Sequence, residues 1–375
     1  MQQKEVLIIG AGLAGLTAAI HLSKLGIKVM LIEKNAFPRH KVCGEYISNE
    51  VLPYFDWLGI DIEELKPTHI TQLQFSTDTG KSIFADLPLG GFGISRYALD
   101  AFLYNKAIAN GCEVLKDNVE SVHFKDDSFT IKTLNGNSYN TPIVLGAFGK
   151  RSNIDQKLQR DFIHKKSSWL AVKAHYTGEF DNTLVGLHNF NGGYCGVSKV
   201  EEDTINICYL ADYKTFKEYR NIADYQNQVM KQNPNLKSIL SNCSMLFDKP
   251  LTISQISFDK KKPVEKHILM IGDSAGLIHP LCGNGMAMAI HSAKIASETV
   301  FQYYHGTIKS RSELEQRYLR QWKREFGKRL ATGRVLSNLL RLPRLTNVIM
   351  RIFIRFPILL PQLIKRTHGK LITSK

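Results

Sequence analysis

Apolar runs and a helical stretch alternate at the start of the chain. Val6 to Ile9 is a continuous apolar run, as in strands that are buried on both faces. A helical pattern covers residues 16–25, and a second strand-like run covers residues 28–32 and ends at Glu33. This order predicts a strand, a helix and a second, parallel strand, which is the repeating unit of α/β sheets.

Two later regions alternate apolar and polar residues, as half-buried strands do. They extend from Thr68 to Phe84 and from Trp169 to Leu210. A further short apolar run, residues 268–271, is followed by Gly272-Asp273 and then by a helical pattern through Thr299. We therefore expect an α/β fold (α+β overall) in which the two alternating regions combine into one separate sheet.

The turn after the first strand has the glycine spacing of a pyrophosphate-binding turn. Gly10 permits a tight turn, Gly12 lets backbone N–H groups approach a phosphate, and Gly15 allows the helix to pack closely on the strand. The N-terminus of the following helix adds a positive potential, and Leu13 and Ala14 of the turn are expected cofactor contacts. A glycine-rich turn of some other α/β fold is the alternative interpretation.

Glu33 stands at the end of the second strand, 18 residues after Gly15. A carboxylate in this place can accept hydrogen bonds from ribose hydroxyls. Because a 2′-phosphate would meet this negative charge, the position favours FAD or NAD over NADP.

The net charge of +15 is concentrated at one end of the chain. Residues 306–375 contain 17 Lys and Arg against 3 Asp and Glu, a net charge of +14, which leaves +1 for residues 1–305. The tail includes a series of arginines that share one helical face unless Pro343 breaks the helix: Arg334, Arg341, Arg344, Arg351 and Arg355. A neutral body with a basic, apolar-rich tail indicates either an anionic membrane surface as partner or a helical region packed on the body. Nucleic acid is not expected, since no binding module accompanies the charge.

The cysteines and the lack of long apolar segments indicate the cellular compartment. The six cysteines form no CxxC pair and no Cys/His ligand spacing, so neither a disulfide framework nor a metal site is expected. No signal-peptide pattern is present, and Arg351 and Arg355 interrupt the best candidate for a spanning segment. We expect a cytoplasmic protein that works in solution or on the inner face of the membrane.

The segment from Gly272 to Ala289 carries the pattern GDxAGxxxPxxGxGxxxA. It resembles the FAD-dependent oxidoreductases of the p-hydroxybenzoate hydroxylase and geranylgeranyl reductase superfamily. The resemblance implies a Rossmann-like FAD-binding domain with an inserted substrate sheet, and it places Asp273 on the flavin ribityl chain. It also places one turn beside the isoalloxazine ring, comprising Pro280, Gly283, Asn284, Gly285 and Met286.

Two intermediate segments strengthen this resemblance. Residues 37–45 end in the K-x-C-G sequence of geranylgeranyl reductases, in which the turn at Cys43 approaches the flavin. Residues 94–100 resemble the segment from which an arginine, here Arg96, reaches the ribityl or pyrophosphate region. Lys34 and Arg39 complete the expected FAD contacts.

The chain departs from the family pattern at two places. Phe148 replaces the aspartate of an Asp-Gly pair that flavin hydroxylases carry, so the electron donor is either NAD(P)H or a separate reductase. The strand around Tyr194 keeps only Gly-Tyr of the reductase pattern Tyr-x-Trp-x-Phe-Pro, and the halogenase pattern Trp-x-Trp-x-Ile-Pro is absent. The resemblance therefore leaves the substrate specificity open.

The candidates for chemistry are few, because a flavin performs the reaction itself and the protein mainly supplies position and shielding. Cys43 and His279 are the catalytic candidates, and Tyr194 is the candidate substrate contact. Each also fits a simple packing role.

The resemblance implies three regions. The FAD-binding domain comprises residues 1–65, 95–165 and 255–305, the substrate sheet comprises residues 66–94 and 166–254, and the basic helical region comprises residues 306–375. We expect a reductase or monooxygenase of a hydrophobic substrate, similar to a lipid, an isoprenoid or a polyketide. The alternatives are an electron carrier, a module that binds a carrier protein, and a flavin halogenase. The oligomeric state stays open.

Overall fold

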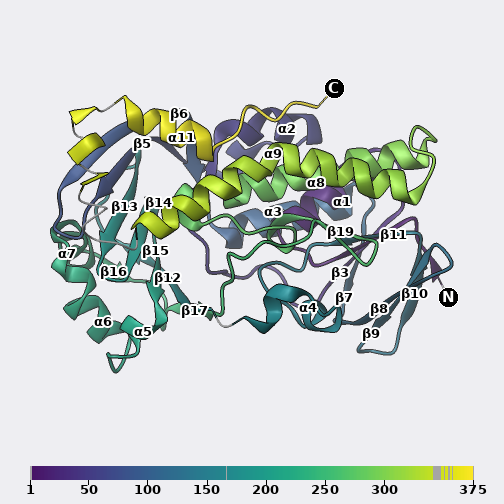
Figure 1. Cartoon of the computed structure of the whole chain (residues 1–375), viewed down its shortest axis with the longest axis horizontal. Helices are drawn as coiled ribbons and strands as arrows, with labels where there is room; N and C mark the ends of the chain where they lie inside the picture. The colour runs from purple at the N-terminus through teal and green to yellow at the C-terminus, as the bar shows by residue number, and fades with distance from the viewer. Residues whose placement is uncertain are drawn as a thin grey trace.

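The computed structural model describes residues 2–165, 167–340, 348–349, 351–353, 355–356 and 358–374. Arg341 and Arg344 of the predicted arginine series, and Pro343 between them, lie outside the described residues. The described elements form three sheets with helices packed around them, a mixed α/β architecture (Figure 1).

A six-stranded sheet forms the centre of the nucleotide-binding part. Its order is β18 (Val264–Glu265), β19 (Ile268–Met270), β11 (Ile143–Gly146), β2 (Val6–Ile9), β3 (Val29–Glu33) and β7 (Glu113–Lys116). All its pairings are parallel except that of β18 with β19. Buried helices pack beside it, namely α1 (Leu13–Lys24), α3 (Arg96–Ala109) and α8 (Gly285–Tyr304). Because helices cover it, β2 is apolar at every position, as the sequence predicts.

A small four-stranded sheet adjoins this part. Its order is β1 (Gln2–Gln3), β10 (Ser138–Thr141), β9 (Ser128–Thr133) and β8 (Val119–Lys125).

A nine-stranded sheet forms the second large layer. Its order is β16 (Ser244–Met245), β12 (Trp169–Thr177), β15 (Ile205–Asp212), β14 (Gly193–Lys199), β13 (Leu184–Phe190), β5 (Thr68–Ser76), β6 (Ser82–Gly93) and β4 (Tyr46–Ser48), with β17 (Leu251–Ser254) also paired to β12. One face packs against α6 (Ile222–Gln228) and α7 (Pro234–Asn242) in a separate apolar core. The other face meets the nucleotide-binding part, and this arrangement positions the site.

Shorter helices connect these layers. They are α2 (Leu52–Leu58), α4 (Asn153–Lys157) and α5 (Tyr213–Phe216), together with 3-10 turns at Asn49–Val51, Ile62–Leu65, Asp161–His164, Met230–Gln232, Gly272–Ser274 and Pro280–Cys282.

The long helix α9 (Arg311–Leu340) lies along α8 (Figure 1). Every fourth residue of α9 between Leu314 and Leu330 is buried and contacts the body, and these residues are Leu314, Tyr318, Trp322, Phe326 and Leu330. The short helix α11 (Leu359–Thr367) packs against β6 and buries Leu360 and Ile364. In the part of the chain described, no helix is long and apolar enough to cross a membrane.

Several predicted boundaries shift. Helix α1 begins at Leu13 rather than at residue 16, since the Leu16 N–H already donates to the Gly12 carbonyl (2.9 Å). Strand β6 continues to Gly93, beyond Phe84, because it gains β4 as a partner. The three-region division with its limits stays a prediction.

Candidate functional site

The turn after β2 has the shape that a bound phosphate requires. Gly10 has a φ of +100°, and a Cβ added there would lie 2.6 Å from the Ala147 carbonyl oxygen. A Cβ on Gly15 would lie 2.0 Å from the Gly10 carbonyl oxygen, whereas one on Gly12 would meet nothing within 4 Å. Among the described residues no side chain caps α1, so the helix N-terminus at Leu13 faces space that an anion can take. This turn fits the pyrophosphate of FAD.

The carboxylate of Glu33 lies at the edge of the same turn. It is 7% exposed, and it accepts hydrogen bonds from the Ala11 N–H (2.9 Å), the Asn35 N–H (3.0 Å) and Arg39 Nη2 (3.3 Å). Lys34 beside it is exposed. The structure therefore gathers the predicted acid and Arg39 at the glycine turn, and their contact with ribose stays a prediction.

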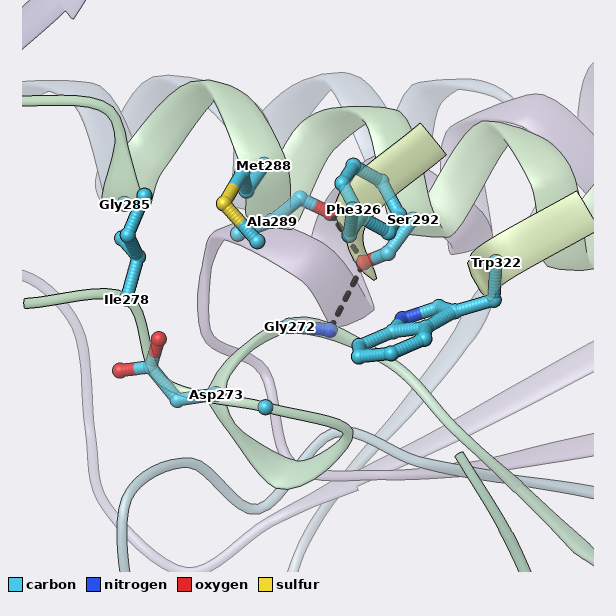
Figure 2. Close-up of a pocket in the computed structure, with 10 residues that line it drawn as sticks. Gly272, Asp273, Ile278, Gly285, Met288, Ala289, Ser292, Trp322 and Phe326 are labelled. Carbon is cyan, nitrogen blue, oxygen red and sulfur yellow. Dashed lines mark hydrogen bonds between the residues drawn. The ribbon is translucent and has the colours of Figure 1, made fainter. Parts of the chain in front are cut away.

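The second glycine motif meets the first in space. Gly272 has a φ of +61°, and a Cβ added there would lie 2.9 Å from the Ala14 side chain. Its N–H donates to the Ser292 hydroxyl of α8 (2.8 Å), while the Asp273 carboxylate leaves the loop on the side away from Trp322 (Figure 2). The cavity drawn in Figure 2 has a volume of about 10 Å³, room for one water molecule. It is therefore too small to hold the cofactor.

One lysine that the sequence analysis missed, Lys261, fixes the Asp273 loop. Lys261 Nζ donates to the carbonyl oxygens of Asp273 and Lys150, each at 2.8 Å. Burial lowers the pKa of Lys261 to about 8, against the opposing effect of the Asp273 charge. The run of three lysines at residues 260–262 was the sequence signal.

The turn predicted beside the flavin ring ends in α8. Pro280 is exposed, Gly283 has a φ of +62°, and Asn284 is buried as the residue before Gly285, the first residue of α8. Met286 in the first turn of this helix lies against Cys43, with 3.4 Å between the two sulfur atoms. The structure thus brings two segments predicted to touch the flavin into contact.

Arg96 is engaged by a carboxylate of its own helix. Its Nε and Nη2 donate to the two oxygens of the buried Asp100 at 2.8 and 2.7 Å, and Lys41 Nζ lies 2.5 Å from Asp100. Burial alone would raise the pKa of Asp100, but Arg96 and Lys41 outweigh it and lower the pKa. The predicted contact of Arg96 with FAD stays a prediction.

Tyr194 and His279 come together in an aromatic cluster. Their ring centroids are 5.7 Å apart, and His279 also lies 4.7 Å from Phe258 and 5.9 Å from Trp169. The surrounding core joins the inner face of the nine-stranded sheet to the segment before α8: it consists of Phe75, Ala171, Tyr194, Leu210, Ile256, Leu277 and Leu281. An apolar wall therefore faces the turn predicted to lie at the flavin.

A charged cluster lies farther along the same sheet face. Glu45, directly after the Cys43-Gly44 turn, accepts from Lys173 Nζ (3.0 Å) and contacts His175 Nε2 (2.7 Å). The sequence analysis did not single out this cluster. Its one signal was a lysine and a histidine at alternate positions of the otherwise apolar strand β12.

Comparison with known proteins decides the family. The family described as FAD binding domain matches residues 3–318. The chain belongs to this family. It is a flavoprotein of the p-hydroxybenzoate hydroxylase and geranylgeranyl reductase superfamily, with FAD as its cofactor.

Individual relatives are distant. The chain is 26% identical to "Conditioned medium factor receptor 1" of Dictyostelium discoideum, over 89% of this chain and 70% of that protein. It is 27% identical to "Digeranylgeranylglycerophospholipid reductase" of Methanosarcina acetivorans, over 89% of this chain and 84% of that one. The solved structure of the flavin-dependent brominase Bmp2 superposes with a TM-score of 0.81 at 19% identity, over 98% and 93% of the two chains, and this likeness concerns the fold alone.

Proposed function

We propose that this flavoprotein reduces a hydrophobic substrate of the lipid or isoprenoid class. The observation that carries the proposal is the apolar wall on the inner face of the nine-stranded sheet, which packs toward the turn that precedes α8. Such a wall provides few hydrogen-bonding groups for a polar substrate, whereas it can contact a long hydrocarbon. The printed name of the Methanosarcina relative supports a lipid substrate.

The residues of this chain divide the work. When bound, FAD supplies the hydride, and the protein supplies the binding surface, the exclusion of water and a proton. Tyr194 and His279, both buried, are proposed to contact the substrate, and Cys43 is the proposed proton donor at the turn. The Gly10–Gly15 turn, Glu33 and Asp273 are proposed to hold FAD.

Phe148 bears on the electron donor. Its ring packs near Gly146, where a Cβ would lie 2.9 Å from Phe148 Cε1, at the end of β11. Without the aspartate of the hydroxylase pattern, we propose that a separate reductase delivers the electrons.

The test is mass spectrometry of lipids from cells with and without the gene, complemented by wild type and by Asp273→Ala. The proposal expects lipids that gain pairs of hydrogen atoms only with the wild type. A gain of one oxygen atom would instead identify a monooxygenase. No change in any lipid would favour an electron carrier.

A second proposal concerns the described residues between α9 and α11, several of which expose apolar side chains. Ile352, Phe356 and Ile358 are 44%, 55% and 71% exposed, and the nearby Arg351 and Arg355 are exposed as well. Apolar side chains interspersed with cations are typical of a surface that lies on an anionic membrane. We propose that this segment brings the protein to the inner membrane face, where a lipid substrate is available.

A further inference from the structure

The buried cluster at Glu45 joins two parts of the chain that are far apart in sequence. Glu45 is 0% exposed, and its carboxylate has three partners: Lys173 Nζ at 3.0 Å, His175 Nε2 at 2.7 Å and the Arg96 N–H at 2.8 Å. Lys173 is 0% exposed as well. Burial alone would raise the pKa of Glu45, but His175 and Lys173 outweigh it and lower the pKa, so the carboxylate stays charged.

Stability does not account for such a cluster. Removing charged groups from water costs several kcal/mol per ion, and apolar residues of similar size are often at least as stabilising in the same place. The cluster also holds Glu45 at a φ of +54°, a backbone conformation that costs a side-chain-bearing residue energy. Its value is therefore to be sought in what it holds.

The cluster holds the Cys43-Gly44 turn. Asn206 of β15 donates to the carbonyl oxygens of Gly44 (2.9 Å) and Cys43 (3.3 Å), and it lies opposite His175 in the sheet register. Two adjacent strands therefore bind three consecutive residues of the turn. The same face of β12 carries Ala171 of the apolar wall, so one strand contacts both the apolar wall and the residue that follows the turn.

The charges of the cluster affect the pKa of the neighbouring His40. Burial, followed by the charges of Lys173 and His175, lowers the pKa of His40 to about 4, whereas Glu45 opposes this shift. Lys173 and Glu45 thus act on His40 in opposite directions. Phe247, whose ring centroid lies 5.4 Å from Lys173 Nζ, covers the cluster there.

We propose that Lys173, His175 and Glu45 are positioning residues that fix the Cys43-Gly44 turn against the flavin and set the reduction potential of the bound FAD. The proposal deepens the proposed function and rests on FAD lying beside this turn. A flavin gains negative charge on two-electron reduction, so nearby cations favour the reduced form and an unopposed carboxylate disfavours it. The two signs of charge in the cluster can therefore be separated by experiment.

The experiment measures the midpoint potential of the bound FAD in the purified full-length protein, in wild type, Glu45→Gln, Lys173→Met and the double variant. Glu45→Gln removes the negative charge and should raise the potential. Lys173→Met leaves the carboxylate with less compensation and should lower it. We expect each single change to alter the ratio of oxidised to reduced flavin at fixed potential about tenfold, which is about 30 mV for a two-electron couple. The double variant should return toward wild type.

Val172→Ala is the matched control, because Val172 is the neighbour of Lys173 on β12 and lies in the core on the opposite face. It should lower the melting temperature and leave the potential unchanged. If Lys173→Met fails to fold, Glu45→Gln and the double variant still decide the matter.

Single variants that both shift the potential in the same direction, or that leave it unchanged, would overturn the inference. A lipid that gains an oxygen atom, or no change in any lipid, would contradict the proposed function and leave this inference standing. The two proposals therefore fail separately.

Discussion

Glu45 and Glu50 are two fully buried carboxylates of one segment, and their partners come from different parts of the molecule. Glu45 is held by Lys173 and His175 of β12, a strand paired on both sides. Glu50 accepts hydrogen bonds from Asn284 Nδ2 (3.1 Å), from Arg329 Nη1 of α9 (3.2 Å) and from the Gly369 N–H of the tail (2.6 Å).

The difference shows that a buried carboxylate can fix two different kinds of segment. Glu45 ties the Cys43-Gly44 turn to a rigid sheet, while Glu50 ties the residue before α8 to the C-terminal region. A Cβ on Gly369 would lie 2.4 Å from Arg329 Nη2, so the tail approaches this carboxylate as closely as a glycine allows. Because buried ion pairs add little net stability, both are better understood as specifying an arrangement.

The largest expected effect distinguishes the two carboxylates directly. Glu45→Ala strands the fully buried Lys173, so we expect the free energy of unfolding to fall by about 3–5 kcal/mol. Glu50→Ala should cost less, about 1–3 kcal/mol, since Arg329 is 8% exposed and retains a contact with Asn284. Urea denaturation of the FAD-saturated variants measures both, and a larger loss for Glu50→Ala would reverse the comparison.

Glu33 is a third buried carboxylate, and unlike Glu45 and Glu50 it is predicted to bind a ligand, the ribose of FAD. Glu33→Ala should weaken FAD binding by about 1.5–3 kcal/mol, the range for hydrogen bonds to a charged group. Fluorescence titration of apoprotein with FAD measures the affinity, with Glu298→Gln on the partly exposed end of an ion pair in α8 as control. An unchanged affinity would contradict the placement of the ribose at Glu33.

The Glu50 side of the comparison leads to the tail and its proposed membrane contact. Replacing Arg351 and Arg355 with glutamine should weaken binding to anionic vesicles by about 2 kcal/mol, since each arginine near the surface contributes about 1 kcal/mol. Bound FAD should be unchanged, because these exposed residues lie outside the flavin segments. Equal sedimentation of the variant and wild type with the vesicles, or no binding by either, would contradict the proposed membrane contact.

The smallest expected effect is the pH dependence of stability, at most about 1.4 kcal/mol per pH unit for one group. The pKa of Glu45 in the folded state is lowered from its usual 4.5, so its contribution is present above pH 4.5 and is lost as pH falls through the lowered value. Glu45→Gln should therefore differ most from wild type at neutral pH and converge with it in acid. Parallel melting curves at all pH values would contradict the ionised cluster.

Local demands explain what the sequence could predict. Gly10, Gly15 and Gly272 each meet a close contact that only glycine tolerates, and an apolar run precedes each turn, so the strand, turn and helix order follows from neighbouring residues. Glu33 could be placed for the same reason.

Long-range contacts explain what it could not. Glu45 is separated from Lys173 by 128 residues and from His175 by 130, and no local pattern links them. The packing of α9 was open to prediction, because an apolar residue recurs at every fourth position from Leu314 to Leu330.

The most direct test of the proposed reductase is anaerobic. The FAD-loaded protein is reduced chemically, freed of excess reductant and mixed without oxygen with a membrane lipid extract, while flavin absorbance is recorded and the lipids are analysed by mass. The account predicts that the flavin reoxidises and that a lipid gains two hydrogen atoms for each flavin, whereas Asp273→Ala, expected to retain little FAD, shows neither. A flavin that stays reduced with lipid and reoxidises only when oxygen is admitted would contradict the account.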